Sequence, residues 1–292
     1  MFFQQLISGI SLGSTYALVA IGYSMVFGIL QLVNFANGNI YMLGGVLTLV
    51  FHIAMKGNFA LAFVISVVLT SMLGYGMDCF GLRRLRIKKS PKMTGILFTL
   101  GISMIIEDAV RIFFTAETRP FPGVIDLGKF TIGNSVVNWS QIIVLGSAIV
   151  VMILTTILVN KTKLGKAMLA VSQNTEAAML MGIDSDRVIS FTFALSSAIA
   201  AFSGTLFGMY YQTMDATIGA TVNMKALASS VLGGVGSLPG AMIGGIVVGI
   251  LESLGASYVS AAYRNAIAFI VLIVIILIKP SGLLGKKQVE KV

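Results

Sequence analysis

The feature of this sequence that most constrains its fold is a series of long apolar runs separated by short, mostly basic segments. A helix needs about 20 apolar residues to cross a bilayer, and it must satisfy its own backbone hydrogen bonds there. We therefore expect an all-α polytopic membrane protein, a single domain over residues 1–292, with eight to nine transmembrane segments. The apolar runs are Leu6–Val33, Ile40–Met55, Phe59–Phe80, Met93–Phe114, Trp139–Val159, Val188–Tyr211, Met224–Gly236, Ala241–Tyr258 and Ala266–Ile278.

Composition agrees with this class. Only 11% of the residues are charged and 57% are hydrophobic, whereas a soluble domain carries roughly 25% charged residues. A soluble enzyme is therefore excluded. The net charge of +9 arises from short basic blocks, with Arg83–Lys92 as the densest. Excess Lys and Arg in short loops marks the cytoplasmic side. Because no aromatic residues are interleaved with these charges, we expect no nucleic-acid partner.

The basic blocks predict the topology. If Arg83–Lys92 is cytoplasmic, residues 115–138 form an external loop and residues 160–187 a long cytoplasmic loop. The basic tail, residues 279–292, is then cytoplasmic as well, and the N-terminus lies outside.

Two polar or glycine-rich interruptions predict one or two discontinuous or re-entrant helices. Such interruptions in the two halves of a transporter indicate a central pathway. The stretch Leu32–Gly45 contains three asparagines, which fit either a pore-lining bend or a short cytoplasmic turn. The stretch Val231–Gly245 predicts a turn near Gly233–Pro239. The candidate pathway residues in these stretches are Asn34, Asn37, Asn39, Gly233, Gly234 and Gly236.

Glu252 is a further pathway candidate, because ionisable residues in membrane segments are costly and commonly functional. Lys225 and Arg264 are its possible partners. On another segment, Glu107 and Asp108 lie four and three residues before Arg111, a spacing that favours a local ion pair.

Several kinds of chemistry are missing from the sequence. It has no G-x-x-x-x-G-K-[ST] motif for nucleotide phosphates. With one cysteine, Cys79, and one histidine, His52, a Cys/His metal cluster within one chain is excluded. We therefore expect no catalytic residues, no metal and no cofactor bound by this chain, so that any energy source lies on another subunit.

The cytoplasmic loop 160–187 is the most informative segment. Ala167–Met181 is rich in Ala, Met and Leu and predicts one short helix, which Gly182 would end. Exposed Met-rich surface suits insertion into a partner's groove.

At this loop the sequence resembles the integral-membrane permeases of ABC importers. Glu176-Ala177-Ala178, with Gly182 four positions later, matches the start of that family's EAA signature. The later Ile-x-Leu-Pro of the signature is missing, a departure typical of the branched-chain amino acid permease subgroup. Three more stretches resemble that subgroup in the right order, namely Asn34–Gly38 after Tyr16-Ala-Leu18, Val231–Gly240 and Lys279–Gly285.

The resemblance implies a permease of the bacterial plasma (inner) membrane that pairs with a second related permease, as a heterodimer or a homodimer. It also implies two ATPase subunits, which bind ATP and Mg²⁺, and an extracytoplasmic substrate-binding protein. The residues that match the coupling motif are Gly165, Ala170, Asn174, Glu176, Ala177, Ala178 and Gly182.

The implied cargo is leucine, isoleucine and valine. Urea, short amides and other amino acids remain alternatives within the same fold. A stand-alone channel or secondary carrier is an alternative of another class, although it gives no reason for the cytoplasmic helix.

Overall fold

The computed structural model describes residues 2–114, 117–122, 129–132, 135–260, 263–279 and 282–285. Parts of the predicted external loop 115–138 and the end of the basic tail, residues 286–292, therefore lie outside the described residues.

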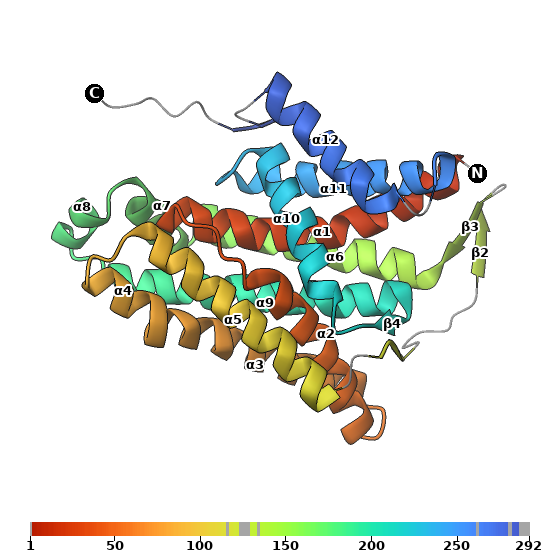
Figure 1. The fold of residues 1–292 in the computed structure, drawn as a ribbon, viewed down its shortest axis with the longest axis horizontal. Helices are drawn as coiled ribbons and strands as arrows, with labels where there is room; N and C mark the ends of the chain where they lie inside the picture. Colours follow the sequence, from red (N-terminus) through yellow and green to blue (C-terminus); the bar gives the residue numbers. More distant parts are fainter. Residues whose placement is uncertain are drawn as a thin grey trace.

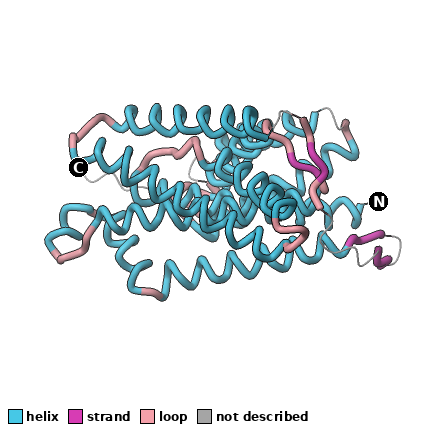
Figure 2. The backbone as a smooth tube through the Cα atoms, turned by 90° about the horizontal axis from the view of Figure 1, so that it is seen from below, coloured by secondary structure: helices cyan, strands magenta, loops and turns pink. Residues whose placement is uncertain are grey.

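The chain is predominantly helical. Several of its long helices run close to one common axis (Figures 1 and 2), whereas the helix Ile218–Gly233 crosses that axis steeply (Figure 1). Within the described residues, six helical segments are long and apolar enough to cross a membrane, namely Phe2–Leu30, Asn37–Ala54, Phe59–Ile87, Trp139–Lys161, Ser185–Tyr211 and Leu238–Tyr258. The helical class is thus confirmed, whereas the count of eight to nine segments stays a prediction. The long helices are α1 (Phe2–Leu30), α2 (Asn37–Ala54), α3 (Phe59–Gly76), α5 (Lys92–Phe114), α6 (Trp139–Lys161), α9 (Ser185–Tyr211), α10 (Ile218–Gly233), α11 (Leu238–Tyr258) and α12 (Arg264–Ile278).

Two small antiparallel pairs of strands complete the described structure. Strand β1 (Arg119–Pro120) pairs with β4 (Thr213–Met214), and β2 (Lys129–Ile132) pairs with β3 (Ser135–Asn138). The β2–β3 hairpin and the start of α1 lie at one end of the molecule (Figure 1), which we call the hairpin end.

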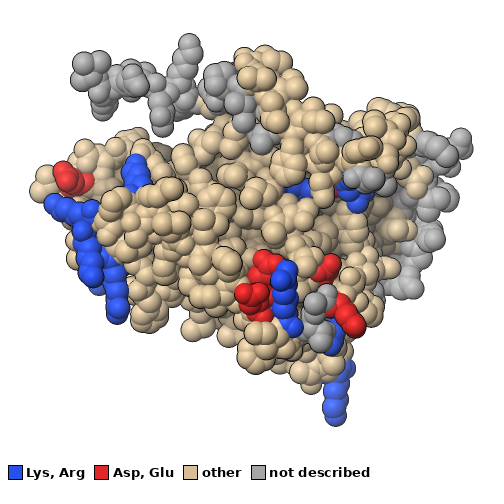
Figure 3. All heavy atoms as spheres, viewed as in Figure 1, with Lys and Arg blue, Asp and Glu red and all other residues tan. Residues whose placement is uncertain are grey.

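The opposite end carries the short helices α4 (Arg83–Ile87), α7 (Lys163–Gln173) and α8 (Thr175–Leu180) (Figure 1). We call it the α8 end. Basic side chains gather at this end, and a broad uncharged surface separates them from the charged groups nearer the hairpin end (Figure 3). The β2–β3 hairpin of the predicted external loop and the helices of loop 160–187 thus lie at opposite ends, as the charge pattern predicts.

Helix α1 is the centre of the core, and glycines allow α11 to pack closely on it. A methyl group added at Gly13 would lie 2.8 Å from the carbonyl oxygen of Gly245, and one added at Gly249 would overlap the backbone of Gly13. Small residues four apart permit this approach, which supplies van der Waals contact where lipid provides no hydrophobic drive.

Non-helical segments precede α2 and α10. Residues 31–36 connect α1 to α2, and residues 212–217 connect α9 to α10. The start of α2 packs against α10, since a methyl group added at Gly38 would overlap the side chain of Asn223. The glycine-rich turn between α10 and α11 occupies residues 234–237, as the sequence predicts.

The helix beginning at Phe59 continues further than the sequence indicates. After α3 it passes through a π-helical turn, η1 (Met77–Leu82), directly into α4. The expectation that Arg83, Arg84 and Arg86 lie in a loop is therefore wrong. Leu82 and Leu85 remain packed in the core, which keeps this basic segment helical.

Candidate coupling surface and buried polar clusters

The loop 160–187 folds into two helices rather than the predicted one. Helix α7 ends at Gln173 and α8 begins at Thr175, because Asn174 adopts an extended conformation, with φ −160° and ψ 108°. Its side chain accepts a hydrogen bond from the amide of Ala177 at 3.0 Å. Asn174 thus caps α8, a role for which asparagine is among the preferred residues, and the cap favours a break over continuation.

Helix α8 projects an apolar tip away from the bundle. The side chains of Leu180 and Met181 are 89% and 82% exposed, and Met179 is 53% exposed. Glu176 and Ala177 lie exposed on the same short helix. Contiguous exposed apolar side chains beside polar ones are typical of a protein interaction site.

Gly182 ends α8, as predicted. Its φ of +82° is a left-handed conformation that glycine adopts without the steric cost other residues meet. The amides of Gly182 and Ile183 donate to the carbonyls of Met179 and Ala178, each at 3.0 Å. Asp184 then caps α9 by accepting from the amide of Arg187 at 3.1 Å.

Other residues of the predicted coupling set lie inside the loop rather than on its surface. A methyl group at Gly165 would overlap the carbonyl oxygens of Leu158 and Val159 at the end of α6. Ala178 is 4% exposed, and Ala170 packs partly buried against the core. These small residues let α7 and α8 fold back against α6 and α9.

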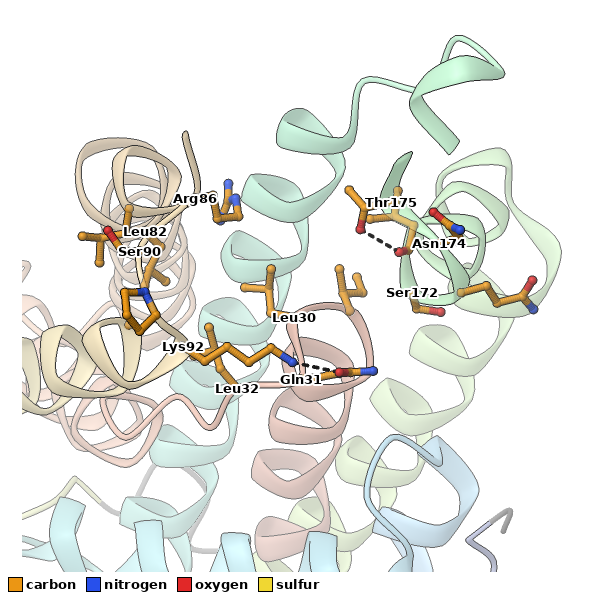
Figure 4. Close-up of a pocket in the computed structure, with 16 residues that line it drawn as sticks. Leu30, Gln31, Leu32, Leu82, Arg86, Ser90, Lys92, Ser172, Asn174 and Thr175 are labelled. Atoms are coloured by element: carbon orange, nitrogen blue, oxygen red, sulfur yellow. Dashed lines mark hydrogen bonds between the residues drawn. The ribbon is translucent and has the colours of Figure 1, made fainter. Parts of the chain in front are cut away.

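A cavity of about 370 Å³ lies between the start of α8 and the bundle (Figure 4). Asn174 and Thr175 line one side of it, and Gln31 and Lys92 line the other. Lys92 Nζ donates to Gln31 Oε1 at 3.0 Å across the lower wall. The N-terminus of α8 is therefore not packed tightly on α1 and α5.

An ionic network that the sequence did not predict lies beside this cavity. Arg86 donates to both oxygens of Asp78, at 2.5 and 3.0 Å, and to Asp186 at 3.2 Å. Arg83 donates to Asp186 at 3.0 Å, and Ser190 donates to the fully buried carboxylate of Asp78 at 2.6 Å. The network joins η1 and α4 to the first turns of α9, immediately after α8.

The three predicted asparagines are buried in protein and do not form an exposed turn. Asn34, Asn37 and Asn39 are at most 2% exposed. Asn39 Nδ2 donates to the carbonyl of Ser103 at 2.7 Å, halfway along α5. Ser196 Oγ donates to Asn37 Oδ1 at 3.2 Å. Asn37 and Asn39 therefore join helices, and a pathway role for the three asparagines stays a prediction.

Asn223 on α10 is the residue that joins this cluster together. Its Oδ1 accepts from the amide of Gly38 at 3.0 Å and from the hydroxyl of Tyr23. Its Nδ2 donates to the carbonyl of Phe35 at 3.1 Å. These bonds satisfy the non-helical backbone before α2, which is required of such backbone at membrane depth. Single-sequence reasoning missed Asn223, whose only signal is a lone asparagine in an apolar run.

The predicted partners of Glu252 are confirmed. Lys225 Nζ lies 2.8 Å from Glu252 Oε1, and Arg264 Nε lies 3.4 Å from the same oxygen. The hydroxyl of Tyr16 also donates to Oε1, at 3.4 Å. The pair Arg111–Glu107 is confirmed as well, at 2.6 Å.

The glycines of the α10–α11 turn have a packing role. A methyl group at Gly233 would overlap the backbone of Gly240, and one at Gly234 would overlap Gly285 of the tail. The amides of Leu283 and Leu284 donate to the carbonyls of Leu232 and Gly233, at 2.8 and 2.9 Å. The turn and the tail motif, far apart in the sequence, thus form one structural unit.

Within the described residues, no cluster of three or more His, Cys, Asp or Glu side chains could hold a metal ion.

Comparison with known proteins decides the family. A family model described as "Branched-chain amino acid transport system / permease component" matches residues 5–276. The chain belongs to this family. It is 35% identical over 305 aligned residues to the high-affinity branched-chain amino acid transport system permease protein LivH of Escherichia coli K12, covering 100% of this chain and 98% of that protein.

Two further relatives extend the match. The permease protein BraD of Pseudomonas aeruginosa is 34% identical over 304 residues, with the same coverage. A probable branched-chain amino acid transport permease protein LivH of Methanocaldococcus jannaschii is 26% identical over 285 residues, 92% of this chain and 88% of that protein.

Proposed function

We propose that this chain is a transmembrane permease subunit of an ATP-driven ABC importer that moves leucine, isoleucine and valine across the plasma (inner) membrane. The observation that carries the proposal is the full-length similarity to permeases named for branched-chain amino acid transport, together with α8 and its exposed apolar tip at the predicted cytoplasmic end. The chain itself performs no catalysis.

Helix α8 is the element that contacts an ATPase. Its exposed side chains, Glu176, Ala177 and Met179–Met181, would occupy a groove on that subunit, as amphipathic helices do in partner proteins. Two ATPases and a second related permease complete the membrane complex, and an extracytoplasmic binding protein delivers the cargo at the hairpin end. ATP and Mg²⁺ are held by the ATPases.

The contacts of α8 suggest how a movement of the ATPases reaches the spans. The cavity beside Asn174 leaves α8 free to shift relative to α1 and α5. Its other end continues through Gly182 into α9, where Asp186 is bonded to Arg83 and Arg86. A shift of α8 would therefore pull on α9 and on the helix that contains η1, and so alternate the spans between two states.

The buried asparagines and the glycines of the α10–α11 turn have a structural role in this mechanism. Asn34, Asn37 and Asn39 hold the breaks in the helices together, and Gly233, Gly234 and Gly236 form the turn beside the tail. Discontinuous helices of this kind accompany central pathways in transporters, so these residues stay our candidates for lining the route in another conformational state.

Affinity purification of the tagged chain from native membranes in mild detergent, read by mass spectrometry, tests the proposal. We expect ABC ATPases and a second permease to copurify, and Ala177→Trp to release the ATPases while retaining the permease. Copurification of the chain alone, under conditions that preserve other ABC complexes, would favour a stand-alone channel or carrier.

A further inference from the structure

A second cavity, of about 410 Å³, lies toward the hairpin end and contains the only buried intramembrane ion pair between Lys and Glu in the described structure. Its position follows from its walls, which include Thr118 next to β1 and Thr213 in β4. Glu252 lies 14 residues beyond the start of α11, about 21 Å along that helix at 1.5 Å per residue. The volume is in the range of small-molecule sites, roughly 300–1,000 Å³.

Two cations meet on one carboxylate oxygen at this cavity. Lys225 and Arg264 both approach one oxygen of Glu252, so two cations share one carboxylate. The Lys225 side chain is 5% exposed, whereas Arg264 is 39% exposed. Arg264 Nη1 donates to the hydroxyl of Tyr211 at 3.2 Å. The more exposed of the two cations is therefore the guanidinium of Arg264 at the cavity wall, where an anionic ligand can reach it.

Glu252 also has unused hydrogen-bonding capacity. Its Oε2 is buried and accepts no hydrogen bond from any described residue. A buried carboxylate oxygen without a donor is costly, and an unseen ion or water is one explanation for such a group. An ammonium group in the cavity would supply the missing donor.

The remaining walls provide complementary surfaces. Asp215 adds a second carboxylate, one oxygen of which accepts from the amide and hydroxyl of Thr217 at 2.7 and 2.9 Å. Phe207, Ile218 and Val222 add apolar surface to the same cavity. Two cations, two carboxylates and an apolar wall therefore face one open cavity.

We propose that this cavity binds a zwitterionic α-amino acid with an aliphatic side chain. Its α-carboxylate contacts Arg264, its α-ammonium contacts Glu252 or Asp215, and its side chain packs on the apolar wall. This assignment rests on the proposed function, because it places a cargo-binding site in the permease itself, at the end where cargo arrives.

Site-specific labelling of the full-length chain in lipid nanodiscs tests the assignment. The exposed wall residue Thr221 is changed by Thr221→Cys in a Cys79→Ser background, and the rate of maleimide labelling is measured with and without L-leucine. We expect leucine to slow labelling several-fold. We expect neither 4-methylpentanoate, which lacks the ammonium, nor 3-methylbutylamine, which lacks the carboxylate, to do so at equal concentration.

Variants separate binding from structural support. Arg264→Gln should abolish protection by leucine, and Arg264→Lys should restore part of it. Arg111→Gln, which breaks an exposed ion pair on α5, should leave protection intact. Equal protection by 4-methylpentanoate would reduce the cavity to an anion site and overturn the proposal. Undiminished protection in folded Arg264→Gln, judged by its melting temperature and elution volume, would show that Arg264 only braces α11 and α12.

The outcome is separable from that of the proposed function. A chain that copurifies with ATPases and supports ATP-driven leucine uptake, but whose Thr221→Cys variant leucine does not protect, would refute the cavity assignment alone. A chain that does not copurify with ATPases would refute the importer, whatever leucine does at this cavity.

Discussion

Arg86 holds Asp78 through two hydrogen bonds across a π-helical turn, and the same guanidinium reaches Asp186 at the start of α9. Asp78 is fully buried, and Arg86 is the cation that compensates its charge. One side chain therefore connects the helix that follows α8 to the helix that begins at Phe59. π-Turns within helices frequently occur at functional sites.

Removing this cation should impair both stability and transport. Arg86→Gln leaves the buried Asp78 without a charge partner, which costs up to about 3 kcal/mol, since breaking a buried ion pair is strongly destabilising and Arg86 is 24% exposed. We expect a lower melting temperature and reduced leucine uptake. The double variant Asp78→Asn with Arg86→Gln should recover stability, because no buried charge remains. Arg84→Gln, on the exposed side of α4, is the matched control. Equal effects of Arg84→Gln and Arg86→Gln would contradict the role of the network.

Bulk on α8 should uncouple ATP hydrolysis from transport. Ala177 is exposed and its amide is held by the cap Asn174, so Ala177→Trp enlarges the surface without disturbing the fold. We expect normal membrane insertion, loss of bound ATPase and loss of uptake. Val150→Trp, at an exposed position midway along α6 and away from both ends, should leave uptake unchanged. Wild-type uptake by Ala177→Trp would show that α8 does not dock there.

The contact between α2 and α9 should tolerate no added methyl group. A Cβ atom at Gly204 would overlap the carbonyl oxygen of Tyr41, whereas one at Gly146 meets nothing within 4 Å. Gly204→Ala must separate α2 from α9, so we expect a destabilisation of about 1–3 kcal/mol, the usual cost of overpacking. Gly146→Ala should be neutral or slightly stabilising, because alanine favours helix over glycine. Thermal melts in detergent measure both, and similar melting temperatures for the two variants would refute the contact.

The sidedness of the two ends is also testable. In the Cys79→Ser background, Glu117→Cys should react with a membrane-impermeant maleimide added outside, and Lys88→Cys should react only after permeabilisation. Both positions are exposed, so accessibility to the protein surface does not confound the comparison. The reverse pattern would invert the topology. Gly123, in the same predicted external loop, lies outside the described residues.

Patterns along the sequence predicted most of the helices, because spans in lipid must be apolar for about 20 residues whatever they pack against. The approximate limits of α5, α6 and α9 follow from hydropathy alone. The turn at residues 234–237 follows from the glycines and Pro239. The ion pair of Glu252 could be predicted from the sequence, because a charged residue in an apolar run needs a partner of opposite charge and the sequence offers few.

What the sequence could not reveal depends on contacts between distant segments. Helix propensity alone predicts a continuous helix through Asn174. The side-chain cap that breaks the helix there and the continued helix differ little in free energy, so propensity cannot choose between them. The basic residues Arg83–Arg86 look like a loop until Asp78 and Asp186 are seen beside them. The role of Asn223 becomes clear only from the contact between α10 and the start of α2, where its side chain bonds the backbone of Phe35 and Gly38. Gly165, a predicted coupling residue, permits the close corner between α6 and α7, which hydropathy alone does not show.

The measurement that tests the central claim most directly is uptake of radiolabelled L-leucine into proteoliposomes that contain the chain with its copurified permease, ATPases and binding protein. The account predicts uptake that requires ATP on the side of the ATPase subunits. This uptake is lost when this chain is omitted, and it is lost with Ala177→Trp. Leucine uptake by the chain alone without ATP would contradict it and identify a stand-alone carrier or channel.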